Sequence, residues 1–188
     1  MFFLITNNIF MTSFIYFIIY SFIGFIIETI YTLLTKGVFK MKKCFMLNFL
    51  CPVYGVGALL ILYTTRKFRK KKLLTSLIGC VVATATELLF GLFYTEFLNA
   101  QVWDYSDVAL NLNGHISLLF SIFWGVLSIL LVYVIHPFLE KKLKINRIPK
   151  PIIYISIIFL SIDFIFSCFF MKKFKTSKAL SISWLINH

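Results

Sequence analysis

The chain has 188 residues, of which 60% are hydrophobic and only 14% are charged. Soluble globular domains contain about 45–50% apolar and about 25% charged residues, so the composition excludes an ordinary soluble domain. The formal net charge of +12 would suit nucleic acid. However, every Lys and Arg falls between apolar runs or after the last one, as is typical of sequence beside a membrane. We therefore expect membrane lipids, and no nucleic acid, as partners.

Five apolar runs are long enough to cross a hydrocarbon core, for which about 20 residues suffice. They cover residues 9–34, 44–65, 73–98, 115–139 and 151–171. The sequence predicts an all-α fold, a polytopic transmembrane helix bundle of about five spans, in which residues 1–188 form a single integral membrane domain. The first run lacks a basic n-region and exceeds the core of a signal peptide, so we expect it to be retained as a span.

The second run has two interpretations, because Asn48, Pro52 and two glycines interrupt it. If it crosses, there are five spans and a cytoplasmic N-terminus, with 11 basic residues inside and 8 outside. If it is re-entrant, there are four spans and an outer N-terminus, with 15 inside and 4 outside. Both arrangements make a multi-pass protein of the cell membrane, with residues 99–114 on the outer side and the basic clusters at 66–72 and 140–150 inside.

Three acidic residues, Glu28, Glu87 and Asp163, fall well within the apolar runs. A charge at that depth costs several kcal/mol or requires a partner, so we expect each to be protonated, hydrogen-bonded to a neighbouring helix or exposed to a water-filled cavity. One interpretation is structural, a neutral carboxyl that ties helices together. The other is functional, a proton-titrating or cation-binding site, for which Glu87 is the best candidate because it lies near the middle of its run.

Small and polar residues recur at helical spacing on three runs, which predicts faces that pack closely against other helices. The three stripes are Ser21, Gly24, Glu28 and Thr32; Ser76, Cys80, Ala83, Glu87, Gly91 and Tyr94; and Ser117, Ser121, Gly125 and Ser128. Glu28 and Glu87 are thus expected to face other helices.

Two further segments carry candidate site residues. Pro52, followed by Tyr54 and Gly55, either exposes backbone groups to a substrate or is a plain kink. The second segment joins two aromatic residues to two carboxylates, which either anchor the chain at the membrane edge or bind a cation and cap a cavity. Its candidate residues are Trp103, Asp104, Tyr105, Ser106 and Asp107, followed by Gly114 and His115.

Motifs for catalysis are absent: there is no phosphate loop, HExxH, GxSxG or dinucleotide fingerprint. We expect no enzymatic activity, no cofactor and no metal site. The four cysteines show no CxxC spacing, so we expect small buried apolar side chains. His115 and His136 near span ends, and the terminal His188, are expected to be structural.

The sequence motifs occur in a familiar order. They are Gly24 with Ile27-Glu28-Thr29-Ile30-Tyr31; Cys51-Pro52-Val53-Tyr54-Gly55-Val56-Gly57; Glu87; and Trp103-Asp104-Tyr105-Ser106 followed by Asn111-Leu112-Asn113-Gly114-His115-Ile116. Over residues 20–140 the chain resembles the CmpB-like family of ABC-transporter type IV membrane proteins, which has an animal transmembrane branch. The resemblance implies a permease component with a separate ATPase subunit as partner.

On that resemblance, ten positions match the family pattern: Glu28, Pro52, Tyr54, Gly55, Glu87, Trp103, Asp104, Tyr105, Ser106 and Gly114. Two positions depart from it. Lys42-Lys43-Cys44 replaces an Asn-Arg-Gly, and His115 replaces an Arg after the loop glycine. His115 pairs with a carboxylate only when it is protonated.

Two functional hypotheses follow. The first is a transport component in which Glu28 and Glu87 line a polar path and residues 103–107 cap its outer end. The second is a non-transporting membrane scaffold or lipid-interacting protein, with carboxylates as structural ties. The inner loops are short for contact with an ATPase. A homo-oligomer stays an open alternative, and no motif names a substrate or a coupling ion.

Overall fold

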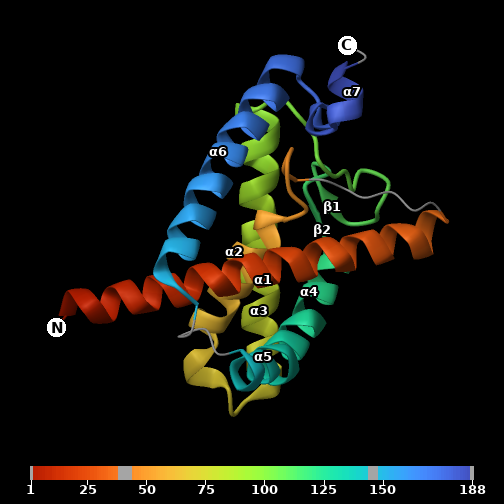
Figure 1. The fold of residues 1–188 in the computed structure, drawn as a ribbon. Coiled ribbons are helices and arrows are strands. Elements are labelled where there is room, and N and C mark those ends of the chain that lie inside the picture. The colour runs from red at the N-terminus through yellow and green to blue at the C-terminus, as the bar shows by residue number, and fades with distance from the viewer. Residues whose placement is uncertain (1, 38–43, 144–147, 187–188) are drawn as a thin grey trace. The chain divides into compact units, whose positions relative to one another are not determined.

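The computed structural model describes residues 2–37, 44–143 and 148–186, and within them the fold is all-α, as predicted (Figure 1). The helices are α1 (Phe2–Lys36), α2 (Pro52–Thr64), α3 (Lys72–Leu92), α4 (Leu118–Leu130), α5 (His136–Lys142), α6 (Lys150–Phe174) and α7 (Ile182–Ile186). Two short strands, β1 (Asn111–Leu112) and β2 (Ile116–Ser117), pair antiparallel, with Asn111 opposite Ser117 and Leu112 opposite Ile116. Several basic residues and one histidine lie outside the described residues. They are Lys40, Lys42, Lys43, Lys144, Arg147 and His188.

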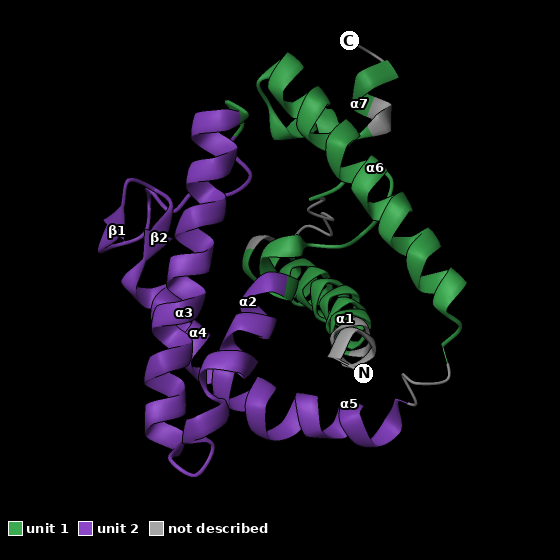
Figure 2. Cartoon of the chain, turned by 90° about the vertical axis from the view of Figure 1, so that its left-hand side faces the viewer, with its two compact units in different colours: residues 1–55, 98–100, 145–188 green, residues 56–97, 101–144 purple. Residues whose placement is uncertain are grey.

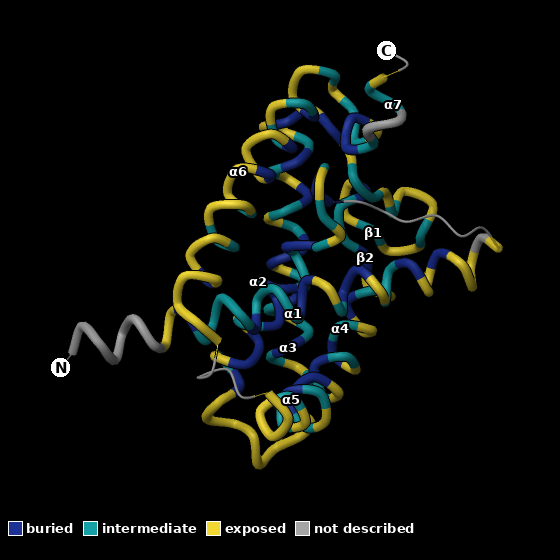
Figure 3. Tube along the Cα trace, in the orientation of Figure 1, coloured by how far each residue is buried: buried dark blue, intermediate teal, exposed yellow. Residues whose placement is uncertain are grey.

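Four helical stretches in the described part of the chain are long and apolar enough to cross a membrane. They are Ile9–Thr35, Lys72–Phe97, Leu118–Lys142 and Lys150–Phe174. The second extends α3 by a π-helical turn, Phe93–Phe97, and the third joins α4 to α5 through another π-helical turn, Leu131–Ile135. Large apolar side chains of these helices are exposed, along most of α6 for example (Figure 3), which suits lipid as the solvent.

The second apolar run does not form a full-length helix. Residues 44–51 are non-helical, and α2 has 13 residues. At 1.5 Å per residue such a helix is about 20 Å long, shorter than the roughly 30 Å hydrocarbon core. The described residues therefore contain four full-length apolar helices, the number expected if the second run is re-entrant. Pro52 is the first residue of α2, where its missing N–H breaks no helical hydrogen bond.

The chain divides into two compact units, shown in different colours in Figure 2. Unit 1 contains residues 1–55, 98–100 and 145–188, and unit 2 contains residues 56–97 and 101–144. Each is described by itself below. That the whole chain forms one membrane domain stays a prediction.

Unit 1 has an aromatic and cysteine core around Phe25, Phe45 and Cys51, against which Leu50 and Tyr54 pack. Cys44 and Cys51 form a disulfide, with their Cα atoms 5.2 Å apart. The expectation that all four cysteines are simple buried side chains is therefore wrong for this pair. The non-helical path of residues 44–51 brings the two Cα atoms into disulfide range, which spacing along the sequence did not reveal. Cys80 and Cys168 are free thiols.

Unit 2 is built on close packing between α3 and α4. A Cβ atom at Gly79 would overlap the Ser128 side chain, and one at Gly125 would lie 3.1 Å from the Ser76 hydroxyl. That hydroxyl donates to the Gly125 carbonyl at 3.0 Å. The prediction that the stripes on the third and fourth runs face other helices is confirmed, since small residues let the two helix backbones approach. Gly79, whose neighbour is Ser128, was not among the predicted stripe residues.

Candidate functional site

Glu87, in α3, is the centre of a buried polar cluster in unit 2. Its side chain is only 5% exposed. The Tyr105 hydroxyl donates to one carboxylate oxygen at 2.8 Å, and the Trp124 indole N–H donates to the other at 2.9 Å. Both donors are side chains, one from the 99–114 loop and one from α4. The prediction that Glu87 faces other elements is confirmed, and its partners are aromatic donors.

Aromatic packing holds the loop against the helices of unit 2. The Tyr105 ring stacks on Phe120 of α4, with ring centroids 4.4 Å apart. Trp103 meets Tyr94 edge to face at 5.8 Å, and its indole N–H donates to the His115 carbonyl at 2.9 Å. Both residues thus make contacts inside the protein, and their predicted role as anchors at the membrane edge stays a prediction. These contacts bring the Tyr105 hydroxyl to Glu87.

A compact turn around Asp104 gives the loop its shape. The Ser106 hydroxyl and backbone N–H donate to Asp104 Oδ1 at 2.6 and 2.9 Å. These two bonds hold the pKa of Asp104 below its ordinary value of 3.8. Gly114 has φ of +72°, and a Cβ there would lie 2.7 Å from Asp104 Oδ1. Only glycine suits this position, because both the backbone conformation and the space exclude a side chain.

His115 lies beside this turn. Its ring packs on Gly91 of α3, where a Cβ would lie 3.1 Å from Nδ1. Its charge when protonated is the smallest of the influences that lower the pKa of Asp104. Asp107 is exposed and makes no polar contact with the described residues. The structure thus joins His115 to the cluster and leaves Asp107 outside it.

Glu28 and Tyr54 form a second polar contact, in unit 1. The Tyr54 hydroxyl donates to Glu28 Oε2 at 2.6 Å. The contact depends on Gly24, because a Cβ there would overlap the Tyr54 ring. The first-run stripe therefore packs against the start of α2, as predicted.

Gly55 lets α1 approach the first turn of α2. A Cβ at Gly55 would overlap the Ser21 hydroxyl and lie 2.7 Å from the Phe17 carbonyl oxygen. The Cys51 backbone N–H, just before Pro52, donates to the Ser21 carbonyl at 3.2 Å. The Ser21 hydroxyl is fully buried and has no hydrogen-bond partner among the described residues.

Asp163, in α6, is held very differently from the other two carboxylates. It is 0% exposed and accepts hydrogen bonds from the Leu47 backbone N–H at 3.1 and 3.2 Å and from Asn48 Nδ2 at 2.7 Å. Ser167, one turn further along α6, donates to Asp163 at 3.3 Å and accepts from the Met46 N–H at 2.9 Å. Ser167 and Asp163 thus accept the backbone N–H groups of Met46 and Leu47, within the non-helical residues 44–51.

The structure gathers the predicted site residues into two groups. Glu87, Trp103, Asp104, Tyr105, Ser106, Gly114 and His115 lie together in unit 2, and Glu28, Pro52, Tyr54 and Gly55 lie together in unit 1. Sequence reasoning missed Trp124 as a partner of Glu87. An indole N–H within an apolar run needs a partner, and that was the available signal. Across residues 2–37, 44–143 and 148–186, no three His, Cys, Asp or Glu side chains gather as metal ligands would.

The sequence matches a family described as putative ABC-transporter type IV over residues 15–170, which is most of the chain. The match covers both groups of site residues and all four full-length apolar helices almost entirely. No curated protein and no solved structure matches the chain. The chain is a membrane protein whose described residues include four apolar helices long enough to span the bilayer, and it belongs to the CmpB-like family of putative ABC-transporter type IV proteins.

Proposed function

We propose that the chain is a permease component of an ABC-type transporter in the cell membrane, with no enzymatic activity of its own. Glu28 and Glu87 belong to its polar path, and residues 103–107 cap the outer end. The observation that carries the proposal is the 2.8 Å hydrogen bond from the Tyr105 hydroxyl to Glu87. It joins a loop residue to a buried carboxylate in a spanning helix.

The chemistry of this contact suits a gate. Tyr105 and Trp124 contact Glu87 through their side chains, which can leave by rotation without breaking any backbone hydrogen bond of a helix. A proton or a cationic group of a substrate could then take their places at the carboxylate. The unpartnered hydroxyl of Ser21 adds a polar atom to the contact between α1 and α2. This hydroxyl supports a polar path in which some polar groups are not hydrogen-bonded to the protein.

The proposed topology has four spans, with the N-terminus and the 99–114 loop on the outer side. Single cysteines test it with a membrane-impermeant maleimide, in a background in which Cys80 and Cys168 are serine. We expect Asp107→Cys to react in intact cells, since Asp107 is exposed in the loop. Lys70→Cys should react only after permeabilisation. The reverse pattern would overturn the assignment of the loop to the outer side.

Proton flux tests the role of Glu87. Purified protein in liposomes is given a pH gradient, and a trapped pH-sensitive dye reports its decay. We expect Glu87→Gln to slow the decay because it removes the titrating group, and Tyr105→Phe to accelerate it because the loop loses its bond to Glu87. Tyr154→Phe, on an exposed part of α6, is the matched control. Equal decay for Glu87→Gln and the unmodified protein would exclude the carboxylate role.

Purification in mild detergent tests the ABC part of the proposal. A tagged chain taken from its own membranes should recover a separate ATPase subunit, identified by mass spectrometry and by ATP hydrolysis. Recovery of the chain alone, or only of further copies of itself, would contradict an ABC assembly. The second of these results would assign a homo-oligomer.

A membrane scaffold is the second candidate, favoured by the way Asp163 is used. It accepts hydrogen bonds from the Leu47 backbone N–H, the Asn48 side-chain amide and the Ser167 hydroxyl, as a structural tie would. If Glu87 is also only a tie, Glu87→Gln should lower the melting temperature substantially and leave proton flux unchanged. Under the transport proposal the same substitution should mainly abolish flux.

A further inference from the structure

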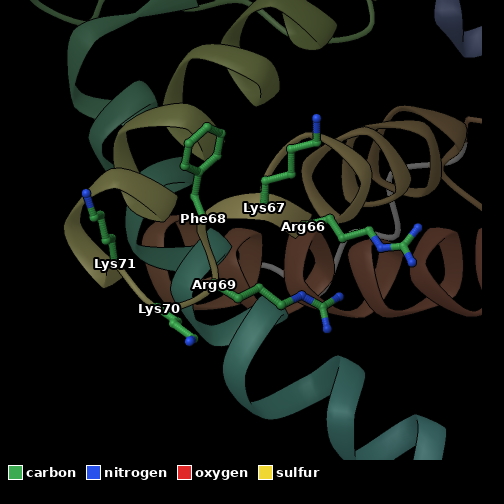
Figure 4. A pocket seen from close by; sticks show the side chains of 6 residues that line it. All are labelled: Arg66, Lys67, Phe68, Arg69, Lys70 and Lys71. Atoms are coloured by element: carbon green, nitrogen blue, oxygen red, sulfur yellow. The ribbon is translucent and has the colours of Figure 1, made fainter.

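The turn between α2 and α3 concentrates positive charge, and we call residues 66–72 the cationic turn. Its six basic residues are Arg66, Lys67, Arg69, Lys70, Lys71 and Lys72. All are exposed, and none forms an ion pair with a carboxylate among the described residues. Residues 66–71 line a hollow of about 480 Å³ (Figure 4).

The backbone of the turn places two guanidinium groups on one side. Residues 66–68 form a single 3₁₀ turn, and Arg69 continues it with φ of −55° and ψ of −18°. In a 3₁₀ helix, side chains three residues apart are eclipsed. Arg66 and Arg69 accordingly extend in the same direction in Figure 4, whereas Lys70 and Lys71 point elsewhere. Two like charges held side by side favour an anion that both can bind.

Two hydroxyl groups, one from buried Thr75 and one from half-buried Tyr133, fix the turn to the helices of unit 2. The Tyr133 hydroxyl donates to the Arg69 carbonyl at 2.9 Å, and Thr75 Oγ1 donates to the Phe68 carbonyl at 3.2 Å. The two hydroxyls are themselves 3.0 Å apart. Thr65, at the start of the turn, is also fully buried. The cationic turn is therefore a fixed backbone that carries exposed cations, not a loose basic tail.

We propose that Arg66 and Arg69 bind the phosphate of an anionic lipid headgroup, and that a phosphomonoester such as phosphatidic acid fits best. Guanidinium groups bind phosphate oxygens in a bidentate fashion, and a monoester presents more free oxygens and charge than a diester. The cationic turn lies directly between two apolar helices and just before α3, which is long enough to span a membrane, so we place the turn at the depth of headgroups. Phe68, in the same turn, is 38% exposed. The proposal does not depend on transport.

The test measures thermal stabilisation of the full chain in detergent by short-chain phosphatidic acid, short-chain phosphatidylglycerol and inorganic phosphate. We expect phosphatidic acid to raise the melting temperature more than phosphatidylglycerol at equal concentration, and inorganic phosphate to have little effect. Equal stabilisation by inorganic phosphate would mean that the ligand is free phosphate, and equal stabilisation by the two lipids would mean that no monoester site exists. Either result overturns the proposal.

Two double variants with the same loss of charge test the location. Arg66→Gln with Arg69→Gln should abolish the preference for phosphatidic acid. Lys172→Gln with Lys173→Gln, at the exposed end of α6, should retain it. An equal loss in both would show a general effect of charge and overturn the site.

A variant that leaves the charge unchanged tests the fixed backbone. Tyr133→Phe removes the hydrogen bond to the Arg69 carbonyl and should weaken apparent affinity for phosphatidic acid about five- to tenfold, as expected for one lost hydrogen bond. Its melting temperature without lipid shows whether the fold is intact. Unchanged affinity in a folded Tyr133→Phe protein would mean that the fixed turn is not part of the site.

Discussion

Asp163 and Glu87 are both buried carboxylates in helices long and apolar enough to span a membrane, yet they accept hydrogen bonds from different kinds of donor. Asp163 accepts from a backbone N–H and from Asn48 and Ser167 in unit 1. Glu87 accepts from two aromatic side chains in unit 2. A backbone N–H of a non-helical segment has no alternative partner in lipid, whereas a tyrosine hydroxyl can rotate towards water. We therefore interpret the first carboxylate as architectural, and the second as the carboxylate that the proposed function requires to change partners.

The largest expected effect is on Asp163. Asp163→Ala leaves the Leu47 N–H and the Asn48 amide without an acceptor, at about 1–3 kcal/mol for each, so we expect a loss of about 2–6 kcal/mol of stability. The measurement is unfolding in detergent. Ser156→Ala is the control, because Ser156 is half-buried and its hydroxyl bonds only within α6. A loss no larger than that of Ser156→Ala would remove the architectural role.

The disulfide should rank second, because it closes the same non-helical segment. Replacing Cys44 and Cys51 by serine releases a loop of about eight residues, which the chain-entropy relation values at about 2.5 kcal/mol. Replacing the free Cys80 and Cys168 by serine is the matched control. If the disulfide variant is less stable than Asp163→Ala, the disulfide rather than the carboxylate is the main support of residues 44–51.

A double-mutant cycle between Glu87 and Tyr105 should show a smaller, specific coupling. For a hydrogen bond to a charged group we expect about 1.5–3 kcal/mol between Glu87→Gln and Tyr105→Phe. The corresponding cycle with Tyr154→Phe should give no coupling, since Tyr154 lies exposed on α6. Coupling near zero for both cycles would mean that Tyr105 does not hold the loop to Glu87.

The smallest effect concerns Asp104 and pH. Because the pKa of Asp104 is lower in the folded loop than its ordinary value of 3.8, the ionised carboxylate stabilises the loop above pH 3.8. This contribution is lost as the pH falls through the lowered pKa. Pepsin, which is active in this range, should cleave the 99–114 loop progressively faster relative to Asp104→Asn as the pH falls. Asp107→Asn should behave like the unmodified protein, and a pH response shared by Asp104→Asn would contradict the assignment.

The long helices could be predicted from the sequence because their apolar runs exceed the thickness of the hydrocarbon core. Whether the second run forms a full-length helix could not be predicted from its length. Pro52 begins a helix as readily as it breaks one, and the hydrogen bonds that the Leu47 N–H donates to Asp163 depend on contacts between distant parts of the sequence. Those bonds join residues 116 positions apart in the chain. No local pattern contains such information.

The residues of the candidate site could be predicted from the sequence, but the contacts between them could not. Helical spacing put Glu87 on an inward face, and the family pattern pointed to Tyr105. The bond between them depends on how the loop folds back over 18 residues, around the left-handed backbone of Gly114. Trp124 reaches Glu87 from another helix, at a separation of 37 residues. The same limit applies to Cys44 and Cys51, which show no recognised spacing motif.

The close packing of α3 against α4 should be visible in the sequences of related proteins. At one point of contact Gly79 faces Ser128, and at another Gly125 faces Ser76. In each pair one helix has a glycine, so that the serine hydroxyl of the other helix can occupy the space. A larger residue at position 79 is tolerated only if position 128 becomes smaller, so the two positions should change together during evolution. An alignment of the family would show this pair as a correlated substitution, and the seam between the two helices as a fixed register along which neither helix can slide.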